Sequence, residues 1–191
     1  DTPAALAASG RVTWTGVNPA ALLSTLPAGP LKLVAEASSA SDGNRLSLSA
    51  RPTSSAGSTH PLALRLAELE GRWFGEQWTL ERLVVDLPQA KLAAQGQWNT
   101  QGQSGEGEGS FSAPGASGTW RTQMAPDTGQ TRVDVQLQQA ERLLPWLRRV
   151  ADVVLPAGEA ENVWPAGLTA RDGGALLLDW QGGWQQARRW W

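Results

Sequence analysis

The chain contains no cysteine, no tyrosine and a single histidine among its 191 residues. Without cysteine it can form no disulfide, no thiolate zinc site and no cysteine nucleophile. The one histidine, His60, lies in the segment STHPLA and cannot make a multi-histidine metal site alone. We therefore expect His60 to be structural or solvated, and neither a metal site nor a serine–histidine–aspartate arrangement is indicated around it.

Charge is also scarce, because Asp, Glu, Lys and Arg make up 18% of the chain and the formal net charge is −2. Such a chain has no basic field that would attract phosphate backbones, so nucleic acid is not an expected partner. The chain opens DTPAALAASG, without a basic signal-peptide start, and contains no apolar run of about 20 residues that would span a bilayer. We expect an internal piece of a longer protein whose targeting and anchoring parts lie outside it.

Carboxylates at close spacing are the remaining candidates for acid–base chemistry. The pairs are Glu68 and Glu70, Glu106 and Glu108, and Glu159 and Glu161. Each pair is more simply a solvated strand end or loop, and the sequence Gly-Glu-Gly-Glu-Gly lacks the lysine of a phosphate loop and the oxygen spacing of a calcium loop. The sequence therefore predicts a protein that is not an enzyme and that carries no cofactor or metal.

Period-two alternation of apolar residues is the dominant pattern, and it places these residues on one face of a β-strand. Turn-forming clusters such as Phe74-Gly75-Glu76 and Pro88-Gln89-Ala90 separate the runs, and short strands at this spacing are typical of an antiparallel meander. The alternating positions are Val12 and Trp14; Leu31, Leu33, Ala35 and Ala37; Leu46, Leu48 and Ala50; Leu62, Leu64 and Leu66; Trp78 and Leu80; Leu83, Val85 and Leu87; Leu92, Ala94 and Trp98; Val133, Val135 and Leu137; and Leu176, Leu178 and Trp180.

Helical spacing is confined to two short windows. Asn18 followed by Pro19 is typical of an N-cap and a first helical turn, and it predicts a turn of helix near residues 19–24. Apolar residues recur at helical spacing between residues 139 and 155. Because proline is tolerated in the first turn of a helix, we predict that this helix runs from Pro145 to Val154.

The stretch Asn99–Gly109, NTQGQSGEGEG, has no large apolar side chain. It could be a flexible loop or a pair of polar strands joined by a turn. Since the apolar pattern resumes at Phe111 and Trp120, we predict a long hairpin tip here. Neither this stretch nor Ser54–Thr59 resembles an interdomain linker, so residues 1–191 are read as a single β-rich segment.

Tryptophan is the main aromatic residue, with 11 Trp against 2 Phe. Exposed tryptophans stack on sugars, usually beside polar hydrogen-bonding groups. Several tryptophans here share the parity of neighbouring aliphatic residues, as in the run from Leu176 to Trp180. The pattern favours lining of a core or groove over a sugar-binding platform.

The stretch from Gly71 to Trp98, GRWFGEQWTLERLVVDLPQAKLAAQGQW, resembles the repeating strand units of the TamB-type translocation and assembly proteins, in the AsmA-like, bridge-like lipid-transfer superfamily. Residues 9–37 and 133–184 resemble the same units, so the resemblance touches most of the chain. It rests on pattern and phrase and not on a signature motif.

The resemblance implies a long periplasmic β-sheet curled into an open trough, a β-taco, with an apolar inner face. It further implies that the full-length protein is anchored in the inner membrane of a Gram-negative envelope. The implied partners are phospholipid acyl chains and a BamA-like outer-membrane barrel protein, and the implied role is phospholipid transport and outer-membrane assembly. No catalytic residues come with this family.

A sheet with one apolar face must have that face covered, closed or used. The pattern alone leaves open a trough or a β-sandwich, and the resemblance favours the trough, with one or two short helices. The alternative function is a stand-alone sandwich that binds carbohydrate or serves as an adhesin-like scaffold. The expected groove-lining residues are Leu64, Leu66, Leu83, Val85, Leu87, Leu92, Ala94, Val133, Val135, Leu137, Leu176 and Leu178.

Overall fold

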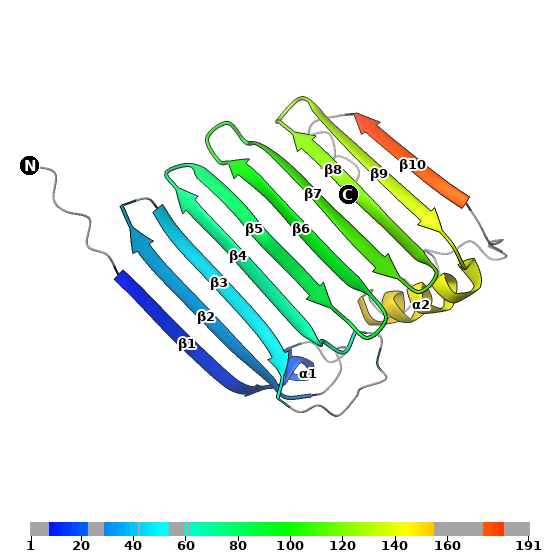
Figure 1. The fold of residues 1–191 in the computed structure, drawn as a ribbon, viewed down its shortest axis with the longest axis horizontal. Helices are drawn as coiled ribbons and strands as arrows, with labels where there is room; N and C mark the ends of the chain where they lie inside the picture. Colours follow the sequence, from blue (N-terminus) through cyan, green and yellow to red (C-terminus); the bar gives the residue numbers. More distant parts are fainter. Residues whose placement is uncertain are drawn as a thin grey trace, which may run out of the picture.

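The residues that the structure describes form one ten-stranded sheet with two helices (Figure 1). The structure is a computed structural model that describes residues 8–22, 29–41, 43–53, 60, 62–154 and 174–181; residues 22, 152–154 and 174–181 are described by their backbone alone. The elements are β1 (Ala8–Val17), α1 (Pro19–Leu22), β2 (Leu31–Ala40), β3 (Gly43–Pro52), β4 (Leu66–Phe74), β5 (Gln77–Asp86), β6 (Lys91–Asn99), β7 (Ser104–Ala113), β8 (Ala116–Met124), β9 (Gly129–Leu137), α2 (Ala140–Val154) and β10 (Gly174–Gln181).

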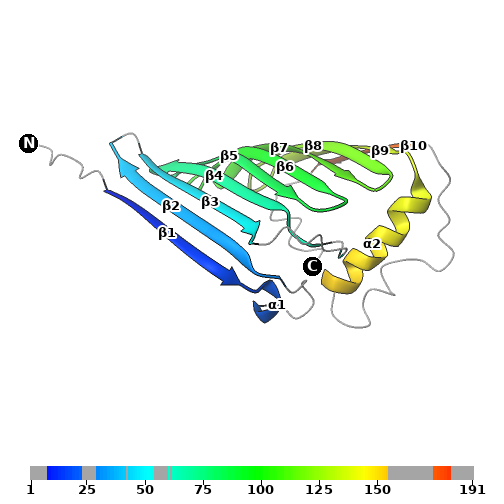
Figure 2. The same cartoon turned by 60° about the horizontal axis from the view of Figure 1, so that its bottom comes forward.

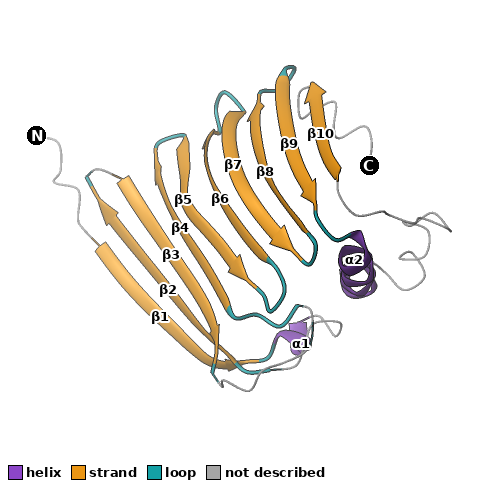
Figure 3. Ribbon diagram, turned by 45° about the vertical axis from the view of Figure 1, so that its right-hand side comes forward, coloured by secondary structure: helices purple, strands orange, loops and turns teal. Residues whose placement is uncertain are grey.

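The strands follow one another in the sheet in the order of the chain, and every neighbouring pair is antiparallel. β1 and β10 form the two edges, so the sheet is not closed into a barrel. Figure 3 shows the strands as a single layer with both helices at one end of it. The predicted mainly β fold, an open antiparallel meander, is confirmed, and the described strands do not form the second sheet that a sandwich requires.

The sheet is curved, and both helices lie on the side toward which its flanks turn (Figure 2). α2 begins against the turn between β7 and β8, where the carbonyl of Gly115 accepts hydrogen bonds from the N–H groups of Gln138 and Gln139. Ala116 at the start of β8 and Ala140 at the start of α2 are two of the three buried apolar residues in the described chain. Little of the sheet is therefore sealed from solvent.

A bulge in β5 keeps its apolar residues on one face. Leu80 pairs with Gly71 and Leu83 pairs with Leu69, although the two leucines are three residues apart. The additional residue between them allows Glu81 and Arg82 to reach ion-pair partners on the opposite face. The two short apolar runs seen in the sequence are thus parts of one strand.

Two strand predictions require correction. Leu62, Leu64 and Leu66 do not form an alternating strand, because β4 begins at Leu66 and the preceding residues are irregular. The glycine-rich stretch is not a long hairpin tip: a short turn follows Asn99, and β7 is a regular strand from Ser104. The turn predicted at residues 74–76 joins β4 to β5 as expected.

The helix predictions are right in place and partly wrong in extent. α1 covers Pro19–Leu22, and residues 23–24 of the predicted turn lie outside the described residues. α2 begins at Ala140, so Pro145 is inside the helix and not in its first turn. Two hydrogen bonds, from the N–H groups of Gln138 and Gln139 to the Gly115 carbonyl, hold the chain just before the helix start. The prediction placed that start at the proline.

Candidate functional site: an open apolar face

One face of the sheet is apolar across its whole width. Directly paired residues of neighbouring strands share a face, so the strand register assigns every residue to one side. The side chains of this apolar face are Val12, Trp14, Leu31, Leu33, Ala35, Ala37, Leu46, Leu48, Ala50, Ala67, Leu69, Trp73, Trp78, Leu80, Leu83, Val85, Leu92, Ala94, Trp98, Phe111, Ala113, Ala116, Trp120, Met124, Val133, Val135 and Leu137.

Aromatic rings cover glycines where the apolar face crosses β6 to β8. Trp98 is paired with Gly105 and Trp120 with Gly109, and a Cβ atom added to either glycine would collide with the facing indole. Phe111 covers Gly118 in the same way. The glycines of β7 therefore belong to the apolar face, because large rings from neighbouring strands fill the space above them.

Tryptophans gather at the end of the apolar face near the β4–β5 turn. The rings of Trp73 and Trp78 are stacked, with centroids 5.1 Å apart and an interplanar angle of 13°. Trp98 is paired with Trp78 across the next strand. These rings share the face of the aliphatic residues, in agreement with the predicted lining role.

The apolar face is open to solvent to an unusual degree. Leu48, Trp78, Leu92 and Trp98 have between 36% and 46% of their surface exposed, although they lie within the sheet and away from its edges. A monomeric soluble protein rarely leaves a contiguous apolar patch uncovered. Such a face is expected to meet an apolar ligand or another surface.

The strand register places seven of the twelve predicted lining residues on the apolar face. These are Leu83, Val85, Leu92, Ala94, Val133, Val135 and Leu137. In β10, the backbone of Leu176 pairs with that of Val135 and the backbone of Leu178 with that of Val133, while their side chains lie outside the described residues.

Three predicted lining residues do not sit on the apolar face within a strand. Leu66 is paired with Asp86 and shares the opposite face with Glu68, so its assignment to the lining is wrong. Leu64 lies in the irregular segment before β4. Leu87 lies in the β5–β6 turn, where its N–H donates to the carbonyl of Ala90.

Several lining residues were absent from the predicted set. Leu33, Leu46 and Leu48 belong to alternating runs that the sequence shows clearly, and their alternation could have identified them. Phe111 and Trp120 were harder to identify because the residues two positions before them in their own strands, Gly109 and Gly118, are glycines and carry no hydrophobic signal.

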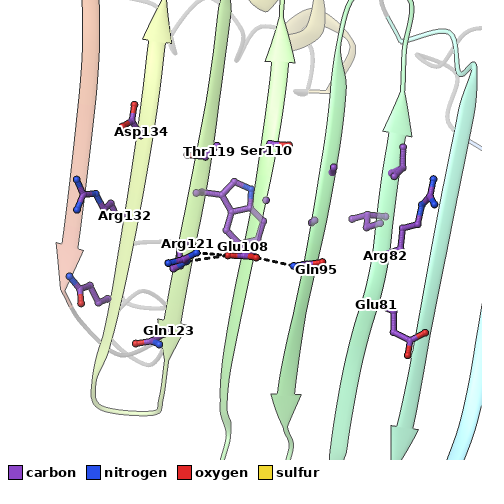
Figure 4. Close-up of a pocket in the computed structure, with 17 residues that line it drawn as sticks. Glu81, Arg82, Gln95, Glu108, Ser110, Thr119, Arg121, Gln123, Arg132 and Asp134 are labelled. Carbon is purple, nitrogen blue, oxygen red and sulfur yellow. Dashed lines mark hydrogen bonds and ion pairs between the residues drawn. The ribbon is translucent and has the colours of Figure 1, made fainter.

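The opposite face is polar and is organised in rows that cross the strands. Glu68 accepts ion-pair contacts from Arg51 at 2.9 Å and from Arg82 at 3.0 Å, which links β3, β4 and β5. Figure 4 shows a second row, in which Glu108 of β7 lies between Gln95 of β6 and Arg121 of β8. The Gln95 and Arg121 contacts to Glu108 measure 2.8 Å and 2.7 Å.

This second row crosses a hollow of about 820 Å³ on the polar face. Hydrogen bonding from Arg121, then from Gln95, and the charge of Arg121 hold the pKa of the exposed Glu108 carboxyl below its ordinary value. The carboxylates Glu106 and Glu108 thus stand in a strand, each bonded to a glutamine side chain of β6, and not in a loop.

His60 has a local structural role. Its Nδ1 accepts a hydrogen bond from the N–H of Leu62 at 3.1 Å. Among the described residues, no group of three or more His, Asp and Glu side chains is close enough to hold a metal ion. The helices described are also too short or too polar to cross a membrane.

Comparison of the chain with protein-family models, with curated proteins and with solved structures found no match.

Proposed function

We propose that this chain is a non-enzymatic segment of a lipid conduit, in which the apolar face holds the acyl chains of phospholipids. The observation that carries the proposal is the width and openness of that face: nine strands contribute apolar side chains to it, and interior members remain more than a third exposed. An acyl chain placed on such a face would gain about 0.8 kcal/mol for each CH₂ group removed from water.

The small number of polar groups on the apolar face, among the residues that the structure describes, supports an acyl ligand over a sugar. Thr122 and Thr131 interrupt the face, but their hydroxyl groups are 2.7 Å apart and satisfy each other. A sugar site would need polar groups directed at the ligand beside the aromatic rings. The ion-paired side chains lie on the opposite face, and the other polar residues that the strand register places on the apolar face are Ser39 and Asn44, which are paired with each other at one end of β2 and β3.

The resemblance to TamB-type proteins supports the wider setting of the proposal. In that setting the full-length protein is anchored in the inner membrane, and the segment stands in the periplasm of a Gram-negative envelope. It carries phospholipid toward the outer membrane, supports outer-membrane assembly and meets a BamA-like barrel protein. These roles extend the acyl-binding proposal and depend on it.

Photocrosslinking tests the acyl-binding proposal directly. The purified chain is incubated with a phospholipid that carries a photoactivatable acyl chain, and crosslinked lipid is measured for the parent and for Val85→Arg and Val135→Asp. A charge among acyl chains costs several kcal/mol in desolvation, whereas on an open face without lipid the same charge reaches water. Both variants should lose crosslinking while their melting temperatures stay close to that of the parent.

The matched control is Val84→Arg. Val84 immediately precedes Val85 in β5, and its pairing with Glu68 places it on the polar face. This variant should retain parental crosslinking. Equal crosslinking of all three variants would reject the apolar face as the lipid site, and unfolding of both apolar-face variants would show that the face is a closed core.

A further inference from the structure

The β4–β5 hairpin carries exposed aromatic residues at its tip. A two-residue turn, Gly75 and Glu76, joins Phe74 to Gln77 at the end of the sheet away from both helices (Figure 1). Phe74 is 67% exposed, the highest value among the large apolar residues of the described chain, and Trp78 is 46% exposed. A turn of this length adds no further residues that could fold back over the rings.

Phe74 does not belong to the apolar face. Its pairing with Gln77 places it on the polar face, whereas the stacked rings of Trp73 and Trp78 lie on the apolar face. Phe74 packs beside Gly43 of β3, where an added Cβ atom would lie 3.6 Å from the phenyl ring, but most of the residue stays in water. Lining of the groove therefore explains the two tryptophans and does not explain the phenylalanine.

The other turns at the same end of the sheet lack this feature. Three further hairpins of the described sheet, β2–β3, β6–β7 and β8–β9, turn there (Figure 1). The strand residues that flank their turns are Ala40 and Gly43, Asn99 and Ser104, and Met124 and Gly129. None of these residues is aromatic. A phenylalanine on the polar side of the tip is thus particular to the β4–β5 hairpin.

The charges beside the tip suit a surface that carries phosphate groups. Arg45 and Arg72 are directly paired on the polar face, and Arg72 stands two residues before Phe74 in β4. An ion pair leaves the Arg72 side chain 55% exposed. The carboxylate of Glu76 accepts a hydrogen bond from the hydroxyl of Thr100, so the acid of the turn is already engaged within the protein. Arginines near a membrane attract the anionic headgroups of its lipids.

We propose that residues 73–78, the aromatic tip, dock into the headgroup region of a phospholipid bilayer. Phe74 enters from the polar side of the hairpin and Trp78 from the apolar side, and aromatic rings favour this region of a membrane. Arg45 and Arg72 then face lipid phosphates. Because Trp73 and Trp78 also belong to the apolar face, the docked membrane is continuous with that face. The proposal adds a membrane contact to the acyl-binding proposal and does not require it.

A protein partner fits the aromatic tip less well. Phe74 and Trp78 belong to opposite faces of a narrow hairpin. A flat partner surface or a second copy of this chain would cover one ring and leave the other in water, whereas the headgroup region of a bilayer surrounds a tip on all sides. The proposal therefore commits to a lipid surface, and self-association becomes an outcome of the test.

Vesicles of phosphatidylcholine and phosphatidylglycerol are the probe, and binding of the full chain is measured by flotation. The chain contains no cysteine, so Gln77→Cys provides a single thiol for an environment-sensitive dye at the aromatic tip. Gln89→Cys places the same dye in the β5–β6 turn at the opposite end of the sheet. With vesicles, the dye at position 77 should show a blue-shifted emission, and the dye at position 89 should not.

Variants on the polar side test the ring and the charge separately. Phe74→Ser should weaken vesicle binding at least about tenfold, because the apolar area that the ring buries in the interface is lost. Phe74→Trp should bind at least as tightly as the parent. Arg72→Gln should weaken binding about fivefold. Arg132→Gln removes a charge from the middle of the polar face on β9, so it is the matched control and should bind as the parent does.

Several results would overturn the proposal. A parent chain that does not float with vesicles has no membrane contact, and equal vesicle binding by Phe74→Ser and the parent would place the contact elsewhere. A dye response at position 89 in place of position 77 would show that the wrong end was chosen. Equal weakening by Arg72→Gln and Arg132→Gln would assign binding to overall charge. A parent dimer in sedimentation experiments that becomes a monomer in Phe74→Ser would make a second copy the occupant.

The vesicle test and the acyl-binding test fail independently. Phe74 lies off the apolar face, so Phe74→Ser should retain parental photocrosslinking with lipid dispersed in detergent micelles. Its melting temperature should also stay close to that of the parent, because the residue is mostly exposed. Loss of vesicle binding with parental crosslinking supports the docking tip, and parental vesicle binding by this variant refutes it whatever the crosslinking shows.

Discussion

The indole of Trp120 occupies the space in which a side chain at Gly109 would stand. The two residues are directly paired between β8 and β7, and a Cβ atom built on Gly109 would lie 2.6 Å from the indole Nε1. The Cβ atom built on Gly109 would also lie 2.5 Å from the carbonyl oxygen of Ala93. Glycine at position 109 is therefore required by its neighbours and not by its backbone angles.

We expect Gly109→Ala to lower the free energy of unfolding by about 1–3 kcal/mol, because the added methyl group displaces the indole and the β6 backbone. Gly107→Ala is the matched control, since it lies two residues away on the same face and its Cβ would make contacts of 3.4 Å and longer. Thermal melting of the two variants measures the difference. Equal melting temperatures would contradict the role assigned to the Trp120 ring.

The ion pairs of Glu68 should contribute modestly to stability. Glu68→Gln removes the charge that holds Arg51 and Arg82, whose side chains are themselves 64% and 54% exposed. Because solvent screens these ion pairs, the expected loss in the free energy of unfolding, measured in urea, is about 1 kcal/mol. The loss should be smaller in 1 M salt, where the Debye length is about 3 Å and charges are screened more strongly. Glu70→Gln, on the same strand and face, should cost less, and a larger loss for this control would argue against the row.

The pKa of the Glu108 carboxyl should depend on Arg121. Because the pKa is lowered in the folded protein, ionised Glu108 adds stability above its unfolded pKa, and this stability is lost as the pH falls through the lowered folded pKa. In Arg121→Gln, the pKa of Glu108 should rise toward 4.5, its ordinary value. Carbon-detected NMR titration of the Glu108 carboxyl measures this, and an unchanged pKa would show that Arg121 is not its main partner.

Trp146 of α2 combines a buried ring with an unpaired donor. The residue is 9% exposed, and its indole Nε1 has no acceptor among the described residues. Trp146→Phe keeps most of the ring and removes the unpaired N–H, so stability should be unchanged or higher. Trp146→Ala should cost about 3–5 kcal/mol. Chemical denaturation of both variants tests this, and a large loss in the phenylalanine variant would reveal a hydrogen bond from the indole.

Period-two alternation alone predicted the class of fold and much of the apolar face. Val133, Val135 and Leu137 of β9 are correctly grouped by alternation because a strand turns every second side chain to the same side. The same rule follows Leu92 and Ala94 along β6. The antiparallel meander follows from short alternating runs separated by turn residues.

Tertiary structure decided the positions at which a residue's partner determines its role. The bulge at Glu81 and Arg82 shifts the parity of β5, and alternation by itself cannot reveal an additional residue. Gly105 and Gly109 look like loop residues in the sequence, yet they complete the apolar face because Trp98 and Trp120 lie over them. The residues of one strand can be read from the sequence, whereas the side chain that fills the space above a glycine comes from the residue paired with it in the neighbouring strand. The sequence alone does not give that pairing.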